Sequence, residues 1–126
     1  MRRHYAVALA MLAGIALGSL GMQTLKAQRP PAAFYIAEVD VSNAAEFAKY
    51  SAAAPAIFDK YGGRYLARGG KTETLEGDPP KRIVVVAFKS MAEAKAWWAS
   101  PEYAAIKPIR HNSAKARNFI VEGVGE

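Results

Sequence analysis

A run of six apolar residues, Ile83-Val-Val-Val-Ala-Phe88, constrains the fold of this chain more than any other segment of its sequence. Four of these residues are β-branched and no Gly or Pro interrupts them, which predicts a β-strand. The run is continuous rather than alternating, and this pattern indicates a strand that is buried on both faces. A sheet built around such a strand needs a covering layer on each side.

The segment before this strand predicts a strand followed by a helix. Residues 33–41 are rich in aromatic and β-branched residues and predict the first strand. Asn43-Ala-Ala-Glu46 is a capping box that starts a helix, and apolar residues then recur at helical spacing up to Tyr61. Pro55 lies inside this stripe and is expected to kink or divide the helix, because proline cannot donate to the carbonyl one turn back. Gly62-Gly63 ends it.

The remaining elements alternate in the same way. Residues 64–76 predict a second strand with a bulge or bend at Gly69-Gly70, and the strand at 83–88 follows. Ser90-Met-Ala-Glu93 is a second capping box, and Ser100-Pro101 starts a further short helix that runs toward Pro108. Residues 109–115 are expected to be irregular, and residues 115–123 predict the last strand.

The predicted order is therefore β-α-β-β-α-β, the ferredoxin-like arrangement of the α+β class, with an antiparallel sheet and helices on one face. No predicted element is left to cover the other face. The simplest cover is a second copy of the chain, sheet against sheet, so we expect a homodimer in the form of a dimeric α/β barrel.

Residues 1–27 differ from the rest and predict a cleavable signal peptide. Arg2 and Arg3 are followed by an uncharged apolar stretch from Tyr5 to Met22, and Leu25 and Ala27 occupy positions −3 and −1 of a cleavage site. Residues 28–32 then form a linker, and residues 33–124 form the domain. The protein is expected to be periplasmic or secreted, without membrane contact after cleavage. An uncleaved N-terminal anchor is the alternative, because the apolar stretch approaches the length of a membrane span.

Charge and composition exclude several classes of protein. The chain has no cysteine, which excludes disulfides, thiolate metal sites and cysteine nucleophiles. Its net charge of +6 owes three positive charges to the signal segment, and the other basic residues are spread between acidic ones. We therefore expect no nucleic-acid partner. No motif for a cofactor or a metal ion is present.

Several short motifs resemble those of the family called domain of unknown function 1330. They are a strand ending in Asp40, Tyr-Gly-Gly-Arg at 61–64, Arg-Gly-Gly at 68–70, Leu-Glu-Gly at 75–77 and Ser-Pro-Glu-Tyr at 100–103. The resemblance covers roughly residues 33–124. It implies a dimeric α/β barrel of the ferredoxin-like kind and no settled activity, although related proteins include small monooxygenases and isomerases.

The candidate ligand-binding residues are mostly charged or phenolic. Arg64 and Arg68 are four residues apart in one predicted strand, so both are expected on one face near Glu76, with Arg82 close by. Such arginines form either a structural network with Glu76 or a cradle for a carboxylate. Tyr50 and Tyr103 are candidates for the walls of this cradle. His111 is either a surface residue or a general base.

Three functions are consistent with these residues. The first is binding of a small organic (acidic) molecule without catalysis. The second is a cofactor-independent isomerase or monooxygenase that uses His111 or Asp40 as its base and an arginine to hold an enolate. The third is a purely structural role in assembly. Whether the protein is an enzyme is left open by its sequence.

Overall fold

The computed structural model describes residues 29–125, so the predicted signal peptide at 1–27, its cleavage site and the alternative anchor lie outside the described residues. The elements are β1 (Ala33–Val41), α2 (Ala44–Lys60), β2 (Arg64–Arg68), β3 (Arg82–Phe88), α3 (Met91–Trp98), α4 (Pro101–Ser113) and β4 (Ala114–Glu122). The strands form one sheet in the order β2-β3-β1-β4, and each neighbouring pair is antiparallel. This is the predicted ferredoxin-like fold.

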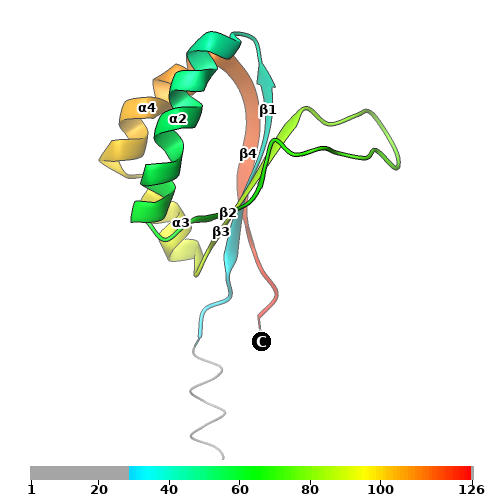
Figure 1. Ribbon diagram of the computed structural model, residues 1–126. Helices are drawn as coiled ribbons and strands as arrows, with labels where there is room; N and C mark the ends of the chain where they lie inside the picture. The colour runs from blue at the N-terminus through cyan, green and yellow to red at the C-terminus, as the bar shows by residue number, and fades with distance from the viewer. Residues whose placement is uncertain (1–28, 126) are drawn as a thin grey trace, which may run out of the picture. The chain divides into compact units, whose positions relative to one another are not determined.

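The three helices of residues 29–125 lie on one side of the sheet (Figure 1). Their starts follow the sequence signals: the side chains of Asn43, Ser90 and Ser100 accept hydrogen bonds from backbone N–H groups three residues later, over 3.1–3.2 Å. These bonds satisfy N–H groups that have no partner inside the helix. The three helix starts are thus set by local sequence.

Aromatic side chains fill the core between the helices and the sheet. Trp97 is fully buried at its centre; its ring stacks on Phe58 at 4.5 Å between centroids and lies 4.3 Å from Tyr103 and 4.7 Å from Tyr35. Aromatic pairs at these distances add stability beyond the area they bury. Trp97 is therefore a packing residue.

No helix of residues 29–125 covers the opposite face of the sheet, whose middle is apolar and whose end carries Glu38 opposite Arg117. Phe34, Ile36 and Val85 share this face with Phe119 and Val121, as the strand pairing shows. Phe119 and Val121 are 46% and 43% exposed. The sequence predicts no element to cover this face, and none of the described helices packs on it.

Three expectations about element boundaries are wrong. The second strand ends at Arg68 rather than at residue 76, and residues 69–81 form a projecting loop (Figure 1). Helix α2 is one element from Ala44 to Lys60, so Pro55 does not divide it. Helix α4 continues past Pro108 to Ser113, so the irregular segment expected at 109–115 is helical for most of its length.

Candidate anion-binding site

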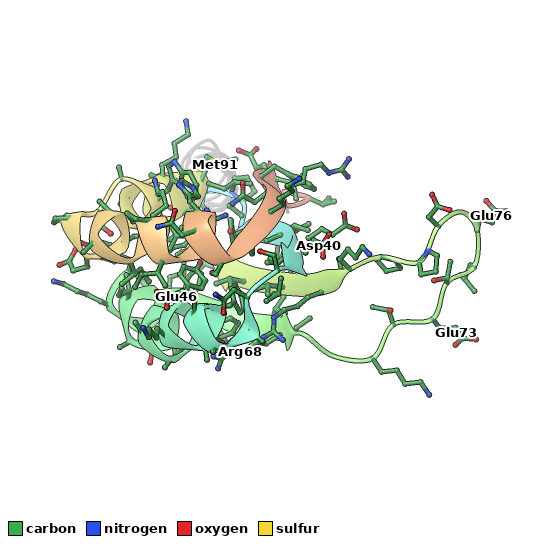
Figure 2. The ribbon with its side chains drawn as sticks, turned by 90° about the horizontal axis from the view of Figure 1, so that it is seen from above. Asp40, Glu46, Arg68, Glu73, Glu76 and Met91 are labelled. Carbon is green, nitrogen blue, oxygen red and sulfur yellow. The ribbon has the colours of Figure 1, made fainter. Side chains whose placement is uncertain are left out.

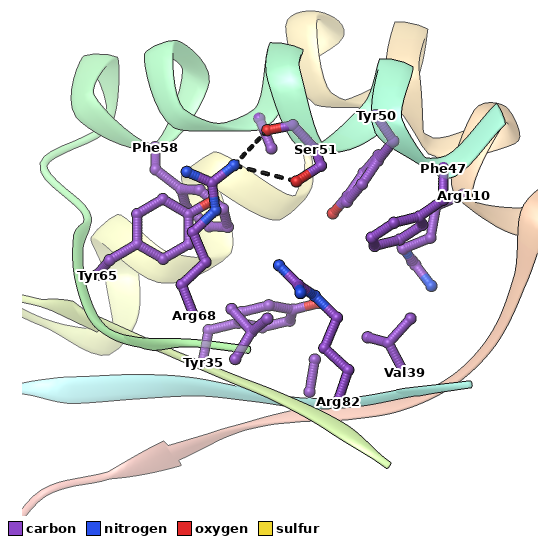
Figure 3. Close-up of a pocket in the computed structure, with 13 residues that line it drawn as sticks. Tyr35, Val39, Phe47, Tyr50, Ser51, Phe58, Tyr65, Arg68, Arg82 and Arg110 are labelled. Atoms are coloured by element: carbon purple, nitrogen blue, oxygen red, sulfur yellow. Dashed lines mark hydrogen bonds between the residues drawn. The ribbon is translucent and has the colours of Figure 1, made fainter. Parts of the chain in front are cut away.

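A pocket lies between the sheet and helix α2, next to the ends of β2 and β3 (Figure 3). Its empty volume is about 380 Å³ including the open mouth, and about 20 Å³ of this can take the centre of a water molecule. That is enough for at least one water. Its walls are aromatic and aliphatic, and three arginines from three different elements, Arg68, Arg82 and Arg110, reach it.

Arg68, the last residue of β2, is held by helix α2. Its Nη2 donates to the carbonyl oxygen of Ser51 at 2.5 Å and to the Ser51 hydroxyl at 3.0 Å, and its guanidinium lies 4.9 Å from the centre of the Tyr65 ring. The Ser51 carbonyl is available because Pro55, four residues later, has no N–H to donate to it. The proline inside the helix therefore leaves the Ser51 carbonyl free to accept the hydrogen bond that holds Arg68.

Arg82, the first residue of β3, has no such anchor. Its guanidinium lies 5.8 Å from the centre of the Phe47 ring, and its Nε is buried without a hydrogen-bond partner among the described residues. A buried donor without an acceptor costs about 1–3 kcal/mol, and more when the group is charged.

Arg110, from α4, is the most deeply buried of the three and is only 4% exposed. Its guanidinium lies 5.8 Å from the centre of the Tyr50 ring. Its Nε likewise has no partner in the part of the chain that the structure describes. Two of the three guanidinium groups thus present a free, buried donor.

None of the described residues that line the pocket is acidic. The two ion pairs found within residues 29–125, Lys49–Glu46 and Lys60–Glu102, lie on the surface and away from it. Buried cations are normally paired or hydrogen-bonded because an isolated charge is costly to remove from water. The pocket therefore concentrates positive charge that no described carboxylate neutralises.

Tyrosine hydroxyls complete the polar part of the site. The hydroxyls of Tyr50 and Tyr103 lie 2.8 Å apart, and the Tyr35 hydroxyl accepts a hydrogen bond from Nδ2 of Asn118 at 3.0 Å. Burial, followed by the nearby Tyr103, raises the pKa of Tyr35 and of Tyr50 above the usual value for tyrosine. Both phenols therefore stay neutral at physiological pH.

The structure brings together half of the residues singled out from the sequence. Tyr50 and Arg68 line the pocket, and Tyr103 contacts Tyr50 directly behind it. Arg82, named as a neighbour of this group, lines the pocket as well.

The other three residues lie elsewhere. Arg64 faces the open side of the sheet because a bulge between Tyr65 and Ala67 inserts one residue and reverses the alternation of side chains before Arg68. Glu76 lies in the projecting loop, far from Arg68 (Figure 2). The expected cluster of Arg64, Arg68 and Glu76 is therefore wrong. His111 is exposed on α4 and does not line the pocket.

Arg110 is not predicted from the sequence as a site residue, because the end of this helix is expected at Pro108. A signal for it exists: Tyr103, Ile106, Arg110 and Ser113 recur at spacings of three, four and three, which is one face of a helix. Ser51 and Tyr35 were also missed. Tyr35 is one of the alternate residues of β1 that are buried, so its inward direction follows from the strand pattern.

Among residues 29–125, no helix has the length and apolar character needed to cross a membrane. Within the same residues, histidine and carboxylate side chains form no group of three or more that could hold a metal ion.

The sequence matches one family model. The model described as "Domain of unknown function (DUF1330)" matches residues 32–124. No curated protein matches the sequence.

Solved structures of other proteins share the fold, among them the following two. A protein of unknown function from Rhodopseudomonas palustris has a TM-score of 0.63 at 16% identity, over 84% of this chain and 92% of its own. SnoaB, a cofactor-independent oxygenase from Streptomyces nogalater, has a TM-score of 0.54 at 17% identity, over 75% of this chain and 94% of its own. At these identities the similarity concerns the fold.

Proposed function

This chain belongs to the family described as domain of unknown function (DUF1330), and we propose that it binds a small organic anion, a carboxylate, in the pocket between the sheet and helix α2. The observation that carries the proposal is the convergence of Arg68, Arg82 and Arg110 on a pocket that contains no described carboxylate. A bound anion would accept from the guanidinium groups of Arg82 and Arg110, whose Nε atoms have no hydrogen-bond partner among the described residues.

A carboxylate suits these donors for a geometric reason. Guanidinium presents parallel N–H groups in a plane, and a carboxylate accepts from two of them at once. The space inside is narrow, so the favoured ligands are small, or they enter after Arg68 and Arg82 at the mouth have moved aside. The aromatic walls, among them Phe47 and Phe58, suit an apolar group attached to the carboxylate.

Binding is favoured over proton-transfer catalysis because the described lining contains no side chain that acts as a base near neutral pH. His111 and Asp40, the two candidate bases, do not line the pocket. A general base must lie within hydrogen-bond reach of the proton that it removes. The fold shared with SnoaB suggests an oxygenase as the alternative. The described lining of this pocket offers no base that would support that alternative.

The proposal extends to the setting of the protein. The signal-like residues 1–27 support export before the domain binds its ligand. The apolar open face, with Phe119 and Val121 exposed, supports a homodimer in which two sheets cover each other.

Thermal unfolding of the purified protein in a buffer of low anion content tests the function. Acetate, benzoate, succinate and inorganic phosphate are added in turn, with neutral benzamide as the control. A carboxylate at about 100 times its Kd stabilises the folded state by about 2.7 kcal/mol, which raises Tm by roughly 10–20 °C for a domain of this size.

A pair of variants locates the binding. Arg82→Met should abolish the Tm rise given by the carboxylates, whereas Lys95→Met, which removes an exposed cation from α3, should leave it unchanged. The proposal fails if none of the carboxylates raises Tm, or if both variants weaken the rise equally, since that pattern indicates nonspecific attraction of anions to a positive surface.

A further inference from the structure

Gly69 lies directly against the guanidinium of Arg82. It is the first residue after β2, its φ is +64°, and its backbone N–H donates to the carbonyl of Ile83 at 2.8 Å. A β-carbon at this position would lie 2.2 Å from Nη1 and 2.6 Å from Cζ of Arg82. These separations are far shorter than van der Waals contact, so the guanidinium occupies the space where any other side chain would begin.

Other contacts leave Arg82 weakly held. Its Nε has no hydrogen-bond partner among the described residues, and its neighbour on the helix side is the Phe47 ring. An unpaired cation at a pocket mouth gains hydration by turning outward, so its inward position depends on what lies around it. The Gly69 backbone and the Phe47 ring are the surfaces that define this position.

We propose that Gly69 is a positioning residue of the anion site: by lacking a side chain, it lets the Arg82 guanidinium lie in the pocket, ready to receive a carboxylate. The ligand part of this inference rests on the proposed function. The positioning part rests on the geometry of Gly69 and Arg82 alone.

The simpler explanation is that Gly69 serves only the turn, because a positive φ favours glycine. Gly77 separates the two explanations. It lies in the same loop with φ +82°, and no atom lies within 4 Å of the place where its β-carbon would be. An alanine at residue 77 therefore suffers the same backbone strain as one at residue 69 without displacing a side chain.

The test uses the Nε–Hε signals of arginine in ¹⁵N-labelled full-length protein, recorded by NMR with and without acetate. The signals of Arg82 and Arg110 are assigned by their loss in Arg82→Lys and Arg110→Lys. We expect Gly69→Ala to shift the Arg82 signal, speed its exchange with water about tenfold or more, and leave the Arg110 signal in place. We expect Gly77→Ala to change neither signal.

Acetate affinity is measured in the same samples. Losing one charged hydrogen bond corresponds to a weakening of about tenfold or more, so Gly69→Ala should raise the acetate Kd by that factor and Gly77→Ala should not. An unmoved Arg82 signal in Gly69→Ala, or equal effects of the two alanines, overturns the inference. If Gly69→Ala does not fold, Gly69→Asn carries the same β-carbon and tolerates positive φ better.

The two proposals can fail separately. If acetate and benzoate move neither arginine signal in the unaltered protein, the proposed function fails. A displaced Arg82 signal in Gly69→Ala still supports the positioning of Arg82 in that case.

Discussion

Replacing Arg110 by methionine should make the protein more stable and unable to bind a carboxylate. Arg110 is 4% exposed, and its Nε has no partner among residues 29–125. Methionine keeps much of the length of the side chain and its apolar contacts while removing the charge. A group retained for binding at the expense of stability should behave in this way.

The magnitude follows from three contributions. Removing a buried charged donor without an acceptor recovers about 3 kcal/mol, the upper end of the usual range. Losing the contact with the Tyr50 ring, 5.8 Å away, costs about 0.5–1 kcal/mol, and losing a cation from the last turn of α4 costs about 0.5 kcal/mol. The net gain is about 1.5–2 kcal/mol, which raises Tm by roughly 6–16 °C.

Urea unfolding of the purified protein and of the variant, followed by tryptophan fluorescence, measures this difference. Lys95→Met, at an exposed site in the last turn of α3, is the matched control: it also removes a cation from the end of a helix and should lower the free energy of unfolding by about 0.5 kcal/mol. A loss of more than 1 kcal/mol in Arg110→Met would refute the reasoning, because it would show that the guanidinium stabilises the empty fold.

Three further predictions concern other parts of the molecule. The hydrogen bond from Lys60, followed by that from Tyr61, holds the pKa of Glu102 at about 2, so Glu102→Gln should lower stability at pH 7. The stabilising effect of a lowered pKa is lost as pH falls. The difference in free energy of urea unfolding between the variant and the unaltered protein should therefore shrink from pH 5 to pH 2, and a constant difference contradicts this. Light scattering should show a dimer that Phe119→Asp splits and that Leu75→Asp, at an 88% exposed loop position, leaves intact; a monomer of the unaltered protein at micromolar concentration contradicts the homodimer. Mass spectrometry of the native protein should find its N-terminus near Gln28, and recovery of an intact chain from the cytosol contradicts export.

The sequence predicted the elements where local chemistry decides the structure. The caps at Asn43, Ser90 and Ser100 and the apolar run at 83–88 carry their signal within a few residues, and the element order followed from them. Helix α4 shows the limit of this reasoning. Pro108 removes one hydrogen bond, but the helix continues because its tertiary contacts outweigh that local cost.

The site was predicted only in part because it depends on pairing between strands. The segment 69–76 has strand-like residues, yet β3 begins only at Arg82, so these residues have no partner strand. No glycine marks the bulge after Tyr65 in the sequence. The regular two-residue alternation of a strand therefore predicted that Arg64 and Arg68 lie on one face. Arg68 was selected by that same count and lines the pocket because the bulge turns it to the helix side, whereas Tyr50 belongs to the helical stripe of α2 and did not depend on the count.

Because of the bulge at Leu66, the number of residues in β2, and not only their types, decides whether Arg68 lines the pocket. Inserting one residue between Ala67 and Arg68, with the bulge kept, would move Arg68 one place along the strand and turn its side chain toward the open face. Because β2 is an edge strand, such a change leaves the pairing of β3, β1 and β4 intact. Insertions and deletions in this edge strand are thus an evolutionary route that changes the pocket in one step. A protein with the same fold can gain or lose the positive charge of the pocket in this way without replacing any arginine.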